Sequence, residues 1–249
     1  MSVTTVLVVG ATGSIGREVV AAATAAGLTA RALVRDVERA GRVLPADTDF
    51  VVGDLTRADT LTDAVHDIDA VIFTHGSETG DWERVDYGGV KNILAALGTR
   101  RPRIALMTSI YVTRLGEGHD EVIGWKRRNE WLVRSSGADY TIVRPSWFDH
   151  AAATDNRIVF EQGDTGDGGI RRDQLARVLV EAILTDTAIG KTLEVFAQPG
   201  EGPGDWSALF GALDPDTGLD GAHDATRVPL EDEPAQIQLD MAAVGARGN

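Results

Sequence analysis

One segment near the N-terminus restricts the fold of this chain more than any other. The run Thr5–Val9 is apolar and β-branched and ends at Gly10, after which a helical pattern begins at Ser14 and ends at Gly27. A strand without polar alternation is typical of a parallel sheet whose two faces are both covered by helices. The segment therefore predicts a strand–turn–helix unit within a parallel α/β sheet.

The chain repeats this alternation of strand and helix as far as Pro145. We expect strands at 29–34, 50–52, 70–74, 104–108 and 140–143, and helices at 14–26, 57–66, 82–97 and 123–135. Regular alternation with short connections predicts a Rossmann-type, doubly wound parallel sheet. In such sheets, ligands bind at the carboxyl ends of the strands.

After Pro145 the pattern changes. We expect a strand at 157–161, a loop at 164–169, a helix at 171–185, a strand at 192–196, a helical stretch at 206–213 and a frayed end over the last ten residues. No internal repeat or clear linker is visible in the sequence. We therefore predict a single domain over residues 1–249, in which about 145–235 form a small C-terminal cap on the substrate side.

Composition restricts the partners of the chain. Apolar residues make up 43% and charged residues 25%, as in globular proteins, and the absence of cysteine excludes disulfides and thiolate sites. The formal net charge of −14 predicts that the chain avoids nucleic acid and anionic lipid. No signal segment or membrane span is visible. We expect a cytoplasmic protein with a small-molecule substrate, no membrane partner and no metal site; the oligomeric state is not predicted.

The seven residues 10–16 read Gly-Ala-Thr-Gly-Ser-Ile-Gly and link the first strand to the first helix. In this context Gly10 allows a tight turn, Gly13 lets the backbone approach a pyrophosphate, and Gly16 lets the helix pack closely. The N–H groups of the first helical turn then face the phosphates. An ordinary strand–helix turn is the alternative. The residues predicted to bind the pyrophosphate of a dinucleotide are Gly10, Thr12, Gly13, Ser14 and Ile15.

The end of the second strand indicates which dinucleotide binds. An acidic residue there accepts hydrogen bonds from a ribose diol, whereas Arg35 stands first after the strand and can bind a 2′-phosphate. We predict NADP(H), and the adjacent Asp36 leaves NAD(H) as the alternative. After the third strand, Asp54 can accept from the adenine amino group and Leu55 can cover the ring, unless Asp54 only caps the next helix.

These segments resemble the short-chain dehydrogenase/reductase superfamily and, more closely, its atypical, NmrA-like branch of NAD(P)-binding proteins. The resemblance covers about residues 3–197 and is carried by the glycine loop and by residues 33–36, 53–55, 85–92, 108–109, 126 and 139–145. In the family, a serine after the fifth strand polarises a substrate carbonyl, and a lysine holds the nicotinamide ribose. The resemblance implies these roles for Ser109 and Lys126. Thr74, Gly76 and Pro145, which lie at strand ends, complete the predicted cofactor site.

The family's proton donor is a tyrosine four residues before the lysine, and this chain has Val122 there. Valine has no proton to give, which leaves three explanations. Another residue could act as the acid, with Tyr111 the first candidate and His119 and His150 behind it. A quinone or flavin could accept hydride without a protein acid. Finally, the protein could bind NADP(H) without turning it over.

The resemblance therefore implies an NADP(H)-dependent oxidoreductase that transfers hydride to a small carbonyl, quinone or flavin. Its predicted catalytic residues are Ser109, Lys126 and Tyr111. The aromatic residues Trp147 and Phe148 follow the sixth strand, where they would favour a flat apolar acceptor or would pack under the C-terminal cap. The alternative function is that of a non-catalytic NADP(H)-binding redox sensor or regulatory protein of NmrA-like type.

Overall fold

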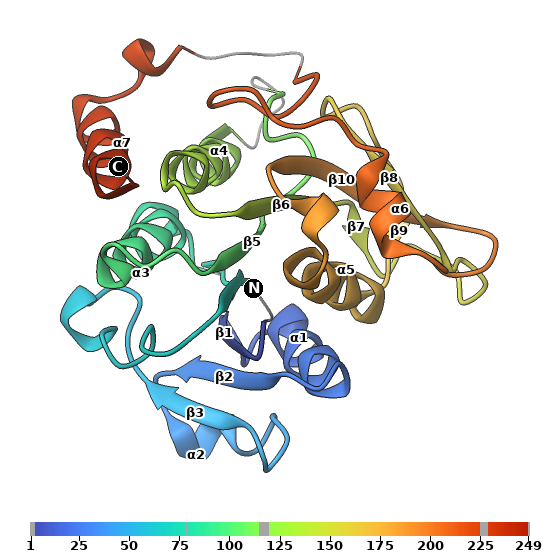
Figure 1. Cartoon of the computed structure of the whole chain (residues 1–249), viewed down its shortest axis with the longest axis horizontal. Helices are drawn as coiled ribbons and strands as arrows, with labels where there is room; N and C mark the ends of the chain where they lie inside the picture. The colour runs from blue at the N-terminus through green and yellow to red at the C-terminus, as the bar shows by residue number, and fades with distance from the viewer. Residues whose placement is uncertain (1–2, 78, 115–119, 225–228, 249) are drawn as a thin grey trace.

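A computed structural model describes residues 3–77, 79–114, 120–224 and 229–248. Its centre is a sheet with the strand order β3-β2-β1-β4-β5-β6-β10-β9-β7, and β8 pairs with β10 outside this path (Figure 1). The strands are β1 (Thr5–Val9), β2 (Thr29–Val34), β3 (Asp49–Val52), β4 (Ala70–Phe73), β5 (Arg103–Met107), β6 (Tyr140–Pro145), β7 (Trp147–Phe148), β8 (Arg157–Glu161), β9 (Gly169–Ile170) and β10 (Lys191–Gln198).

Pairing along the sheet is parallel from β3 to β10, whereas β8 and β9 run antiparallel to β10. The chain runs outward from β1 to β3 and then returns to β4 on the other side of β1. The predicted doubly wound sheet is therefore confirmed. Such a reversal of strand order places ligands at the neighbouring carboxyl ends of the strands.

Helices cover both faces of this sheet (Figure 1). On one side lie α1 (Ser14–Ala25) and α5 (Arg172–Leu184), and on the other lie α3 (Gly88–Leu97), α4 (Asp120–Ser135) and α7 (Ala235–Gly248). Successive side chains of β1 point to opposite faces of the sheet, so β1 packs against both helix layers. Val6 and Val8 belong to the hydrophobic cluster of α1 and α5, whereas Leu7 and Val9 belong to that of α3, α4 and α7.

Shorter elements complete the described chain: α2 (Val37–Ala40), α6 (Trp206–Gly211), a π-helical segment Trp82–Tyr87 before α3, and 3₁₀ helices at Ala58–Thr60, Asp186–Ala188 and Leu230–Asp232. The elements expected after Pro145 are present, with boundaries shifted by one or two residues. The two-residue strands β7 and β9 and the four-residue α2 were not expected, because such short segments carry no periodic pattern.

The helix expected at 57–66 is wrong. Only Ala58–Thr60 forms a 3₁₀ helix, and turns follow it. The Thr60 hydroxyl donates to the carbonyl of Arg57 at 2.8 Å and accepts the N–H of Asp54 at 2.9 Å. Threonine and aspartate side chains that bind nearby backbone groups in this way compete with helix formation.

The frayed C-terminus expected from the sequence is also wrong, because α7 is an ordered helix. Its buried residues Ile237, Met241 and Val244 pack on α3 and α4. The Asp240 carboxylate accepts a hydrogen bond from the hydroxyl of Tyr87 at 3.1 Å. The spacing of the three apolar residues is helical, but a helix this polar forms only when it has a layer to pack against.

Among the described residues, no helix is both long and apolar enough to cross a membrane. The same part of the chain brings together no group of three or more His, Cys, Asp or Glu side chains suited to holding a metal ion.

We expect Gly16→Ala to lower the free energy of unfolding by roughly 1–3 kcal/mol. A Cβ at residue 16 would overlap the carbonyl oxygen of Gly10, a backbone atom that cannot move without distorting the loop. Urea denaturation measures the loss. Gly204→Ala is the control, because a Cβ there meets nothing within 4 Å. Equal stability of Gly16→Ala and wild type would contradict this packing argument.

Candidate active site

The loop between β1 and α1 leaves the first turn of α1 open. Gly10 has a φ of 90°, and its carbonyl accepts the N–H of Gly13 at 2.9 Å. Gly13 is the N-cap of α1, so no side chain caps the helix, and its first turn contains no acidic residue. Thr12 and Ser14 are exposed beside this turn, and Ile15 is buried beneath it. Unpaired N–H groups at a helix N-terminus suit a phosphate.

Arg35 and Asp36 follow β2, and the structure gives them different surroundings. The Asp36 carboxylate accepts the N–H of Arg39 at 3.0 Å and thereby caps α2. Arg35 is exposed at the strand end. Because Asp36 is engaged with its own helix, Arg35 is the side chain left to meet a ligand at this edge.

Asp54 follows β3 and closes a turn. Its Oδ1 accepts the backbone N–H of Thr56 at 2.9 Å and its hydroxyl at 2.8 Å. These hydrogen bonds lower the pKa of Asp54, and the charges of Arg35 and Arg57 lower it further. Arg35 therefore lies within electrostatic reach of Asp54. Leu55 is half-buried next to it, and contacts of both residues with adenine stay a prediction.

At the end of β4, the sequence analysis predicted Thr74 and Gly76 as cofactor residues but missed His75 between them. The hydroxyl of Thr74 donates to the carbonyl of Val9 at 3.0 Å, and Gly76 is exposed. Between them, the Nε2 of His75 lies 3.1 Å from the carbonyl oxygen of Asp86, which can only accept. Nδ1 is then an acceptor, and it is buried without a hydrogen-bond partner in the described part of the chain. The position of His75 directly after the predicted strand at 70–74 was the sequence signal that could have identified it.

Burial lowers the pKa of His75 to about 4, and the nearby Lys126 contributes in the same direction. The imidazole is therefore neutral at pH 7. Asp86 is buried beside it and accepts the N–H of Ser77 at 2.7 Å, and burial raises the pKa of this carboxyl.

A cavity of about 580 Å³ lies at the carboxyl ends of β5 and β6. Its volume is typical of small-molecule sites. Three segments line it: Met107, Thr108, Ser109, Ile110, Tyr111 and Arg114 after β5; Val122, Ile123 and Lys126 on α4; and Pro145, Ser146, Trp147 and Phe148 at the end of β6. The structure thus brings together the predicted residues Ser109, Tyr111, Lys126 and Pro145, whereas the other predicted cofactor residues lie at the ends of β1 to β4.

Two hydroxyl groups beside the cavity have no hydrogen-bond partner in the described part of the chain. The Oγ atoms of Ser109 and Ser146 are buried and form no hydrogen bond with any described residue. Lys126 places its Nζ 3.4 Å from the carbonyl oxygen of Thr108. Burial lowers the pKa of Lys126, although the charges of Asp86 and Glu130 act in the opposite direction.

Tyr111 lies in a strained part of the cavity wall. Its φ is 72°, and its N–H donates to Oδ1 of Asp164 at 2.6 Å. The guanidinium carbon of Arg114 is 4.2 Å from the centre of the Tyr111 ring, and the Trp147 ring makes an edge contact at 6.3 Å. His150 is exposed and stacks on Trp147, and His119 lies outside the described residues.

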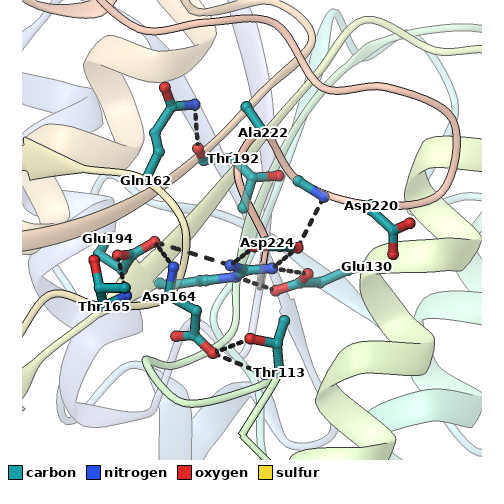
Figure 2. A network of polar contacts seen from close by, with 12 residues as sticks. Thr113, Glu130, Gln162, Asp164, Thr165, Thr192, Glu194, Asp220, Ala222 and Asp224 are labelled. Carbon is teal, nitrogen blue, oxygen red and sulfur yellow. Dashed lines mark hydrogen bonds and ion pairs between the residues drawn. The ribbon is translucent and has the colours of Figure 1, made fainter. Parts of the chain in front are cut away.

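A buried network of polar contacts joins the elements that carry the cavity residues (Figure 2). Arg144 of β6 is fully buried and donates to both carboxylate oxygens of Glu130 at 3.0 and 2.8 Å, and to both of Asp224 at 2.7 and 2.9 Å. Glu130 also accepts the hydroxyl of Thr108 at 2.8 Å. The network therefore joins α4, β6 and the residue before Ser109.

The same network holds the loop that carries Tyr111. Glu194 of β10 accepts the backbone N–H groups of Asp164 and Thr165 at 3.0 and 3.1 Å (Figure 2). Asp164 in turn accepts the N–H of Thr113 at 2.7 Å and its hydroxyl at 2.8 Å. Sequence analysis did not assign these residues to the site, because their partners lie far away along the chain.

Comparison with known proteins shows the family to which this chain belongs. The sequence profile described as NAD(P)H-binding matches residues 10–186. The chain belongs to the NAD(P)H-binding family. The predicted resemblance to atypical, NmrA-like proteins is therefore confirmed, as is the binding of a nicotinamide dinucleotide.

Three similar proteins illustrate the range of this family. Photosystem II assembly factor Ycf39 of Synechocystis is 27% identical over 76% of this chain and 61% of its own length. Sanguinarine reductase of Eschscholzia californica is 29% identical over 51% of this chain and 52% of its own length. A putative NAD-dependent epimerase/dehydratase from Bacillus halodurans has a TM-score of 0.72 and 25% identity, over 84% of this chain and 100% of its own. The chain thus spans little more than half the length of the two curated relatives.

The residues of this NAD(P)H-binding protein fit the cofactor. The open first turn of α1 offers N–H groups to a pyrophosphate. Arg35 offers a cation beyond β2, and Lys126 offers an ammonium group beside β5. The buried acceptor Nδ1 of His75 needs a donor, which a ribose hydroxyl could supply.

If Arg35 binds the 2′-phosphate, Arg35→Ala should weaken NADPH binding about 10- to 100-fold and leave NADH binding nearly unchanged, because only NADPH carries that phosphate. Isothermal titration calorimetry with both cofactors measures this difference. Arg177→Ala on α5 removes an equal charge away from the strand ends and is the control. Equal losses for the two cofactors would contradict the assignment.

The low pKa of His75 predicts a dependence of stability on pH. Histidine in the unfolded chain takes up a proton near pH 6.5, whereas folded His75 stays neutral down to about pH 4. Acid therefore favours the unfolded chain, and stability falls as the pH is lowered from 6.5 to 4. His75→Gln should make this slope shallower in urea denaturation at several pH values. His66→Gln, on the surface, is the control, and an unchanged slope in His75→Gln would contradict the prediction.

Proposed function

We propose that this protein is an NADP(H)-dependent oxidoreductase that transfers hydride to a small carbonyl, quinone or flavin acceptor. The observation that carries the proposal is the hydroxyl of Ser109, which is buried beside a cavity of about 580 Å³ and has no partner among the described residues. Buried hydroxyls are normally paired. An acceptor oxygen in the cavity would provide the missing hydrogen bond.

The proposed roles follow from the positions of the side chains. Ser109 hydrogen-bonds and orients the acceptor oxygen. Lys126 donates from Nζ to the nicotinamide ribose, and bound NADPH supplies the hydride. Residues of about 145–235 form the substrate side, because Trp147 and Phe148 contribute to the cavity wall and Asp164 supports the loop that carries Tyr111.

The source of the proton that accompanies hydride transfer restricts the class of acceptor. Val122 lines the cavity one helical turn before Lys126 and has no proton to give. Tyr111, two residues after Ser109, is the candidate acid in the cavity wall. A quinone or flavin that accepts hydride can take its proton from water, so positioning by the protein is sufficient. Reduction of an organic acceptor is also in the name of one relative, sanguinarine reductase.

A second candidate function is that of a non-catalytic NADP(H)-binding sensor or regulatory protein. Val122 favours it, because such a protein needs a dinucleotide site but no dedicated proton donor. The similarity to a photosystem II assembly factor, whose name is not that of an enzyme, points in the same direction.

Turnover separates the two candidates. The purified protein should oxidise NADPH when quinones, flavins and aldehydes are supplied in turn, as followed by NADPH absorbance. Ser109→Ala should lower kcat/KM for the best acceptor about 10²-fold, the usual effect of removing one hydrogen bond to a reacting oxygen. NADP⁺ affinity and Tm, which do not depend on that hydrogen bond, should be unchanged. Tight NADPH binding without oxidation by any acceptor would contradict the proposal and favour the sensor.

A further inference from the structure

The cavity differs in charge from the rest of this acidic protein. The chain carries a formal net charge of −14. Among the described residues that line the cavity, however, the charged ones are Arg114 and Lys126, both cations. Despite the large excess of carboxylates in the chain, no described Asp or Glu belongs to this lining.

Among the described residues, neither cation forms an ion pair with a carboxylate. In the described part of the chain, no Asp or Glu oxygen lies within 4.0 Å of the charged nitrogens of Arg114 or Lys126, whereas the buried Arg144 is paired with Glu130 and Asp224. Uncompensated charge in a partly buried place is costly. Anions that bind in the cavity would remove that cost.

Arg114 is held in place while its charge stays available. Its Nε donates to the carbonyl oxygen of Asp164 at 2.9 Å, and its guanidinium stacks on Tyr111. The carboxylate of Asp164 is engaged with the N–H groups of Tyr111 and Thr113. The terminal nitrogens of Arg114 thus form a preoriented fork, which matches the oxygens of a carboxylate, sulfonate or phosphate.

The remaining wall suits a flat ring. Tyr111 and Trp147 meet edge to face, Phe148 lies next along the chain, and Trp147 is 52% exposed. Aromatic walls favour planar ligands by stacking and by burial of apolar area. Val122 and Ile123 add apolar surface on the α4 side.

We propose that the hydride acceptor is a flat aromatic ring system that carries an anionic group, and that Arg114 binds this group. The inference rests on the proposed oxidoreductase function and specifies its substrate class. Lys126 is assigned to the cofactor, so Arg114 is the cation among the described lining residues that is left for the acceptor. The same charge disfavours cationic ring systems and gives neutral ones no added attraction.

Riboflavin and FMN test this proposal, because they share one ring system and differ by a phosphate. Quenching of flavin fluorescence in the presence of NADP⁺ should give a Kd at least about tenfold lower for FMN than for riboflavin, the effect of a charge-assisted hydrogen bond. Arg114→Gln should remove this difference while riboflavin binding stays the same. Arg114→Lys should retain part of it, and Tm values check that each variant is folded.

A second pair, menadione and 1,4-naphthoquinone-2-sulfonate, asks whether the preference follows the charge on another ring. A preference for FMN without one for the sulfonate restricts the acceptor to flavin phosphates. Arg177→Gln is the control, because Arg177 also lies over an aromatic ring, that of Trp206, but away from the cavity.

Equal affinities within both pairs, or a preference that survives in Arg114→Gln, would overturn the inference. Binding and turnover also separate it from the proposed function. Charge-selective binding without NADPH oxidation would contradict the oxidoreductase and leave the anion site in place. NADPH oxidation without a preference for anionic acceptors would support the oxidoreductase and contradict the anion site.

Discussion

The guanidinium of Arg144 is buried between the carboxylates of Glu130 and Asp224, and the region around the cavity depends on this arrangement. Removal of one member would leave an uncompensated buried charge at a cost of about 3–5 kcal/mol. Burial alone would lower the pKa of Arg144, but Glu130 and Asp224 raise it above its usual value. One buried network of ion pairs therefore joins helix α4, strand β6 and the segment that carries Asp224.

This coupling also positions the functional residues. Lys126 lies one helical turn before Glu130 on α4, so the ion pair that fixes Glu130 fixes Lys126 as well. Ser109 follows Thr108, whose hydroxyl donates to the same carboxylate. The buried ion pair of Arg144 and Glu130 thus holds Lys126 and the hydroxyl of Ser109 in place beside the cavity. A ligand can use groups that are preoriented in this way without first ordering them.

The fold was largely predictable because its signals are local. An apolar β-branched run, a glycine loop and a helical pattern each act over a few residues, and these identified β1, α1 and the alternation up to β6. The two failures have different origins, one local and one tertiary. At 57–66, the Thr60 side chain competes for backbone groups, and at the C-terminus the weakly apolar α7 needs the layer formed by α3 and α4. Neither effect is visible in periodicity alone.

The sequence by itself determined the parallel sheet, the open N-terminus of α1, the arginine after β2 and the absence of tyrosine at residue 122. These follow from residue identity and from spacings shorter than one helix. Only the tertiary structure decided that Ser109, Tyr111 and Lys126 share one cavity, and that Arg114 forms no ion pair with a carboxylate of the described residues. The physical reason is distance along the chain: Arg144 and Asp224 are 80 residues apart, and Tyr111 and Asp164 are 53. Hydrogen bonds between such residues form only after the chain has packed, so no local pattern encodes them.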